Sequence, residues 1–243
     1  MVGSGFKVLL TKEFKEVKRS VLSSFLYSIF YAVFIEWFIL QNYIKAYAKL
    51  ANAGTLDIPE LLGQAALSTL MFAGPIMITF FGNIIMTRSF IRERSSGALI
   101  PLLGTGIKQR AVWLAKLTTA FCISYIALII ALLINVLMII FHFKIPIRVS
   151  FYALVSTLLI TPVASLAVLS ILSVLYWSLK SPQFIAATVP TLFSISIWTY
   201  LVAKPRTVVD ISVLVIVISI SAITIFMCAI IINRLNRKRL MAI

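Results

Sequence analysis

Long apolar runs recur along this sequence, and they constrain its fold more than any other feature. Each run has about 20 residues or more, which is the helical length that crosses a hydrocarbon core of roughly 30 Å. Backbone groups left unpaired in hydrocarbon are costly, so a chain that enters lipid must pair them internally, and long solid runs do so as helices. The chain is 61% hydrophobic and only 12% charged. The sequence therefore predicts an all-α integral membrane protein.

The runs divide the chain into about six predicted transmembrane helices. These spans cover residues 21–44, 61–90, 111–143, 151–179, 184–203 and 208–232. The other parts are an amino-terminal helix at 1–20, a polar segment at 91–110 and a basic tail at 233–243. No soluble domain fits between the runs, so residues 1–243 are predicted to form a single transmembrane domain.

The amino-terminal segment has the pattern of a short amphipathic helix. Phe6, Leu9, Leu10, Phe14 and Val17 recur at helical spacing, and lysines occupy much of the remaining surface. The segment is too short and too charged to span a bilayer. Such a helix is expected to lie in the membrane interface, with its apolar face at the acyl boundary. The alternative is that this face packs against protein.

The cations are distributed unequally between the two predicted sides of the membrane. Sixteen lie on one side, namely Lys7, Lys12, Lys15, Lys18, Arg19, Arg88, Arg92, Arg94, Lys108, Arg110, Lys116, Lys180, Arg234, Arg237, Lys238 and Arg239. Six lie on the other, namely Lys45, Lys49, Lys144, Arg148, Lys204 and Arg206. Cytoplasmic loops carry the excess of Lys and Arg. Both termini and the segment 91–110 are therefore predicted to be cytoplasmic, in a multi-pass protein of the cell membrane.

The net charge of +15 does not indicate nucleic-acid binding. The basic residues flank apolar spans, where they set topology and contact anionic membrane lipids. Membrane lipids are accordingly an expected partner, and nucleic acid is not.

Residues that could carry enzyme chemistry are few. The chain has one histidine, His142, and seven scattered acids, so neither a metal site nor a catalytic pair can be argued from the sequence. The run GTGIKQR lacks the GxxxxGK[ST] spacing of a phosphate-binding loop. We therefore predict no enzyme activity, no metal and no cofactor in this chain.

Three polar residues within spans are candidates for a translocation path. Glu36 is a carboxylate within the first span, and an intramembrane carboxylate is costly enough to indicate function by default. A hydrated or paired carboxyl near the outer interface explains Glu36 equally well. Asn83 and Asn135 are weaker candidates, because hydrogen bonds between helices explain such residues adequately.

The segment IRERSSGALIPLLGTGIKQRAVWLAKL carries the most specific pattern in the chain. With the amphipathic helix and the order of spans, it resembles the permease subunits of ABC type-2 exporters. The matching residues are Arg92, Glu93, Arg94, Gly97, Leu99, Leu102, Leu103, Thr105 and Lys116. The chain departs from the family pattern at Ala98, Ile100 and Gly106. The loss of an acid at position 100 makes the predicted contact surface more apolar.

The resemblance implies a permease that works with a separate ABC ATPase subunit and a second permease, identical or different. ATP and Mg would then bind to the ATPase, and not to this chain. The residues expected to couple the permease to the ATPase are Arg92, Glu93, Arg94, Gly97, Leu99, Leu102, Leu103 and Lys108. Two other functions stay open from the sequence: an ion- or proton-coupled carrier that uses Glu36, and a membrane scaffold without transport.

Overall fold

In the residues that the computed structural model describes, all regular secondary structure is α-helix. These are residues 6–16, 58–97, 107–143, 151–179 and 211–234, with isolated positions between 26 and 41 and at 148, 188 and 192. Four long helices occupy these ranges: α2 (Ile58–Ser95), α4 (Gln109–Phe143), α5 (Phe151–Ser178) and α7 (Ile211–Arg234). A shorter helix covers residues 6–16.

Each of the four long helices is long and apolar enough to cross a membrane. They fall on the second, third, fourth and sixth predicted spans, so the prediction of an all-α membrane protein is confirmed. The first and fifth predicted spans lie mostly outside the described residues, as do Glu36 and the tail at 233–243. The number six for the spans therefore stays a prediction.

One boundary differs from the prediction in a way that matters for the site. The second span was expected to end at residue 90, but α2 continues as helix to Ser95. Arg92, Glu93 and Arg94 therefore belong to the last turns of a helix and not to a loop. Gly97 follows with a φ of 68°, the left-handed conformation that commonly ends a helix.

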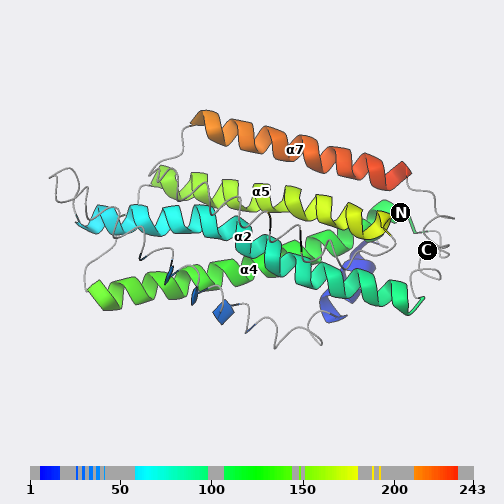
Figure 1. Cartoon of the computed structure of the whole chain (residues 1–243), viewed down its shortest axis with the longest axis horizontal. Coiled ribbons are helices and arrows are strands. Elements are labelled where there is room, and N and C mark those ends of the chain that lie inside the picture. Colours follow the sequence, from blue (N-terminus) through cyan, green and yellow to red (C-terminus); the bar gives the residue numbers. More distant parts are fainter. Residues whose placement is uncertain are drawn as a thin grey trace.

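In the bundle, α2 packs against α4 and α5, α5 packs against α7, and α4 crosses α2 and also contacts α5 and α7 (Figure 1). The helix at 6–16 lies at the end of the bundle where α2 and α5 end and α4 begins (Figure 1). At the opposite end, the Arg148 backbone N–H donates to the Pro59 carbonyl at 3.2 Å. This bond links the start of α2 to the connection between α4 and α5.

Small residues let α2 approach its two neighbours closely. A Cβ added at Gly74 would lie 2.5 Å from Thr161 of α5 and 3.3 Å from Leu128 of α4. A Cβ at Gly82 would lie 2.8 Å from Leu169 of α5. Close approach through small residues is a common basis of helix packing in membranes, because the hydrophobic effect contributes little to helix association in lipid.

Large apolar side chains are exposed on α4 and α7. Leu133 and Phe141 of α4 are exposed by 56% and 77%, and Ile223 and Phe226 of α7 by 63% and 65%. Small polar residues lie inward instead: Ser165, Ser170 and Ser173 of α5 are each 0% exposed. The bundle is thus apolar outside and partly polar inside, as expected for a protein whose solvent is lipid.

The packing at Gly82 gives the first prediction. Gly82→Val should lower the melting temperature in detergent or nanodiscs, because overpacking a close contact costs about 1–3 kcal/mol. Adding Leu169→Ala should recover part of that loss, since it removes the carbon atoms that the new side chain would strike. If the losses in melting temperature of the two single variants add fully in the double variant, residues 82 and 169 do not contact each other as closely as in the structure.

Candidate functional site

A buried ammonium lies at the point where the helix 6–16, α2 and α4 meet. Lys116 is on the second turn of α4, and its side chain is 0% exposed. Its Nζ lies 2.8 Å from Glu13 Oε1, 2.9 Å from Glu93 Oε2 and 2.5 Å from Ser89 Oγ. Nζ donates hydrogen bonds to Glu13 Oε1 and Ser89 Oγ, and it forms an ion pair with Glu93 Oε2. Lys116 therefore joins three elements through two hydrogen bonds and an ion pair with each glutamate.

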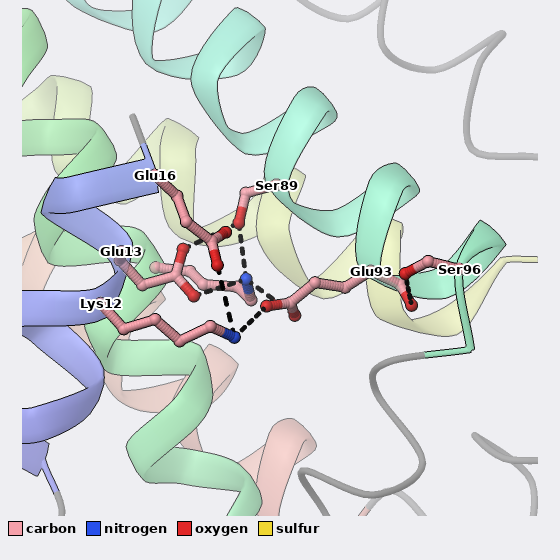
Figure 2. A network of polar contacts seen from close by, with 7 residues as sticks. Lys12, Glu13, Glu16, Ser89, Glu93 and Ser96 are labelled. Atoms are coloured by element: carbon pink, nitrogen blue, oxygen red, sulfur yellow. Dashed lines mark hydrogen bonds and ion pairs between the residues drawn. The ribbon is translucent and has the colours of Figure 1, made fainter. Parts of the chain in front are cut away.

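The acceptors come from two elements that are distant in the sequence. Glu13 belongs to the helix 6–16, whereas Ser89 and Glu93 lie one turn apart near the end of α2. Figure 2 shows these side chains pointing toward one another between the helices. Ser89 Oγ also donates to Glu13 Oε2 at 2.9 Å, so the serine bonds both charged partners.

A second lysine closes the network on its outer side. Lys12 Nζ lies 3.1 Å from Glu93 Oε1 and 3.7 Å from Glu16 Oε1 (Figure 2). Burial acts to lower the pKa of the Lys12 ammonium, but the nearby carboxylates, Glu93 first among them, hold that pKa above its ordinary value. Lys12 therefore stays charged and compensates the carboxylate of Glu93. We call Lys12, Glu13, Ser89, Glu93 and Lys116 the corner network.

Aromatic rings cover the inner side of the corner network. Lys116 Nζ lies 5.4 Å from the centroid of the Phe90 ring, within the range of a cation–π contact. Phe90 in turn contacts the rings of Tyr176 and Trp177 near the end of α5. The network is thus shielded from the bundle interior by apolar groups, and it links indirectly to α5.

The helix 6–16 uses its apolar face to pack against the protein. Leu9 is 3% exposed and belongs to the buried core, and Phe6 and Leu10 pack against that core. Acyl chains were expected to cover this face. Protein covers it because Glu13 lies on the same side of the helix and needs a cationic partner, which hydrocarbon cannot supply.

Comparison with known protein families gives one match. The family model for ABC-2 family transporter proteins matches residues 9–197. The chain belongs to the ABC-2 transporter family. No curated protein and no solved structure matches it. All five residues of the corner network fall within the part of this ABC-2 chain that the family model covers.

The structure separates the expected coupling residues of this ABC-2 protein into two groups. Arg92 and Lys108 are exposed at the two ends of the connection between α2 and α4, and Gly97 shapes its start. Glu93 is 5% exposed and faces the protein's own lysines. Leu99, Leu102 and Leu103 lie outside the described residues, as do Thr105 and the side chain of Arg94.

Gly97 is needed for its backbone and not for lack of space. A Cβ at this position would meet no atom within 4 Å, but the φ of 68° is one that other residues rarely adopt. The last turn of α2 is capped just before it, where the Ser96 N–H donates to the Arg92 carbonyl at 2.9 Å. Gly97 thus ends α2 with a left-handed backbone conformation.

The two asparagines proposed for a translocation path are buried within the helices. Asn83 Oδ1 accepts a hydrogen bond from Tyr176 Oη at 2.6 Å, and that hydroxyl also lies 2.6 Å from Thr87 Oγ1. Asn135 Nδ2 donates to the Ala131 carbonyl of its own helix at 3.1 Å. The contacts of Tyr176 with Asn83 and Thr87 hold α2 to α5, whereas the bond of Asn135 lies within α4. A role for either asparagine in a path stays a prediction.

The corner network yields a prediction on stability. Lys116→Met should strongly lower the melting temperature, because removing one partner of a buried ion pair costs about 3–5 kcal/mol. Hydrogen exchange of residues 6–16 should also speed up, since their buried carboxylate would lose its main partner. Lys12→Met is the matched control, and its effect should be smaller because that side chain is 40% exposed. Equal losses from both variants would contradict the central role of Lys116.

Proposed function

We propose that this chain is the permease subunit of an ATP-driven exporter of the ABC-2 family. A separate ABC ATPase subunit would supply the energy, with ATP and Mg bound there, and a second permease, identical or different, would complete the pathway. The family assignment supports transport. The absence of a phosphate-loop pattern from the sequence supports an external motor.

The observation that carries the proposal is the corner network. Residues 98–106 join the end of α2 to the start of α4, where a partner on the cytoplasmic side would push. Lys116 of α4 is bonded to Glu93 of α2 and to Glu13 of the helix 6–16. A displacement of this connection would therefore move three elements together, because their buried bonds would break only at high cost.

The contact with the ATPase is proposed to have an apolar centre and a basic rim. Leu99, Leu102 and Leu103 would supply the centre, and the exposed Arg92, Lys108 and Arg110 the rim. An apolar core with a polar rim is the usual anatomy of a protein interface. Glu93 would contribute from inside, by holding the end of α2 in place against α4.

The orientation follows from the charge count and can be tested separately. Both termini and the corner network are proposed to face the cytoplasm of the cell membrane. In a variant with Cys122 and Cys228 replaced by alanine, Ser96→Cys should react with an impermeant thiol reagent only from the cytoplasmic side, since Ser96 is exposed. Asn52→Cys should react only from outside. Outside labelling at position 96 would overturn both the topology and the coupling role.

The coupling role gives a prediction on function. Leu102→Asp and Leu103→Asp should each weaken ATPase capture or uncouple ATP hydrolysis from efflux, since an unpaired charge in an apolar groove is poorly compensated. The bundle should still fold, because these residues precede α4. Leu102→Met keeps the apolar volume and should behave like the parent.

The measurements are co-purification with the ATPase, its hydrolysis rate and substrate efflux on the same preparations. The isolated permease should hydrolyse no ATP. If both aspartate variants assemble, hydrolyse and transport as the parent does, residues 98–106 are a plain loop and the coupling proposal fails.

A further inference from the structure

The helix 6–16 divides its charges between a buried side and an outward side. Glu13 is 2% exposed and bonded to Lys116. Lys7, Thr11 and Lys15 are exposed, and at 100° per residue they lie within one 80° sector of the helix surface. Val8 lies at the edge of that sector and is 69% exposed. The outward side is therefore basic, with one apolar side chain beside the lysines.

The acids at this end of the bundle are engaged within the protein. In the sequence, the segments predicted to be cytoplasmic contain only three acids, Glu13, Glu16 and Glu93. Glu13 and Glu93 are bonded to Lys116, and Glu93 and Glu16 to Lys12. Because Lys12 and Lys116 pair with these carboxylates, the carboxylates do little to neutralise the outward lysines. The surface of this end is left with a strong positive charge.

Further exposed cations surround the same end. Arg88 and Arg92 are on α2, Arg110 is on α4, and Arg234 is the last residue of α7. Arg88 precedes the last residue of α2 by seven positions, a depth of about 10 Å at 1.5 Å per residue. Cations that are spread around a bundle suit lipid headgroups, which surround a membrane protein on all sides, better than they suit a single docked protein.

We propose that the outward side of the helix 6–16, formed by Lys7, Val8, Thr11 and Lys15, is a binding site for anionic phospholipid headgroups. The two lysines attract the phosphate groups, and Val8 contacts the outermost acyl carbons. The exposed arginines extend the same positive surface around the bundle. Lipid thus meets this helix on its basic side, and not on the apolar side that the protein covers.

The opposite end of the bundle offers a matched comparison. Arg148 is exposed there, but its backbone bonds to Pro59, the neighbour of the exposed acid Glu60. Asp57 precedes Pro59 by two residues in the sequence. Cations and acids are mixed at that end, so its Lys144 and Arg148 should attract anionic lipid much less.

The test uses the permease alone in vesicles, so it does not depend on any ATPase or on the exporter assignment. Spin-labelled phosphatidylglycerol and spin-labelled phosphatidylcholine are compared by the fraction that the protein immobilises. The parent should prefer phosphatidylglycerol. Lys7→Gln/Lys15→Gln should reduce that preference by about twofold or more, since each cation near an anionic surface contributes substantially to binding. Lys7→Arg/Lys15→Arg should keep it, and Lys144→Gln/Arg148→Gln should leave it nearly unchanged.

Salt provides a further check, because 1 M salt shortens the screening length to about 3 Å and should remove most of the preference. The substituted lysines are exposed, so the melting temperature should stay near that of the parent. An unchanged preference in the glutamine double variant overturns the proposal, as does a parent without any preference. If that variant keeps its lipid preference but loses capture of an ATPase subunit, the outward side serves a protein partner and the lipid site is refuted.

Discussion

The ammonium of Lys116 sets the geometry of one whole end of this protein. A charge taken out of water costs several kcal/mol unless charged and hydrogen-bonding partners replace its hydration. Lys116 lies on a membrane-spanning helix and its side chain has no exposed surface, so its polar partners must come from neighbouring elements. Glu93 and Ser89 come from α2, and Glu13 comes from the helix 6–16. The position of that short helix is therefore a consequence of charge compensation.

The same ion pairing determines which charged side chains are exposed at this end of the bundle. The corner network buries Glu13 and Glu93, whereas Lys7, Lys15, Arg88, Arg92, Lys108, Arg110 and Arg234 are exposed among the described residues. The same ion pairs thus have two consequences. They join the helix 6–16, α2 and α4 in a buried junction, and they leave exposed lysines and arginines on the outside of this end of the bundle. Without the ion pair between Glu93 and Lys116, the end of α2 could move relative to α4. A neutral exterior would lose the attraction to anionic headgroups.

The sequence alone predicts the helices well, because hydrocarbon leaves few alternatives for a long apolar run. It predicts the contacts between them poorly. Lys116 and Glu93 were both recognised from the family pattern, but neither was paired with Glu13, which lies 103 residues from Lys116. One signal was available: Glu13 follows Leu9 by four residues and Leu10 by three, so it falls on the apolar side of its own helix. An acid in that position needs a buried cation.

Charge also explains why the second span is predicted to end at residue 90, whereas α2 continues as a helix to Ser95. Arg92, Glu93 and Arg94 are polar enough to end a hydropathic run, and so they were assigned to the segment 91–110. In the structure, the carboxylate of Glu93 is bonded to Lys116 and Lys12, so its charge is compensated where it lies. The helix can then continue to Ser95 with that carboxylate buried, while Arg92 extends outward. Hydropathy assigns each residue a value of its own, whereas the cost of burying Glu93 depends on lysines 23 and 81 residues away along the chain.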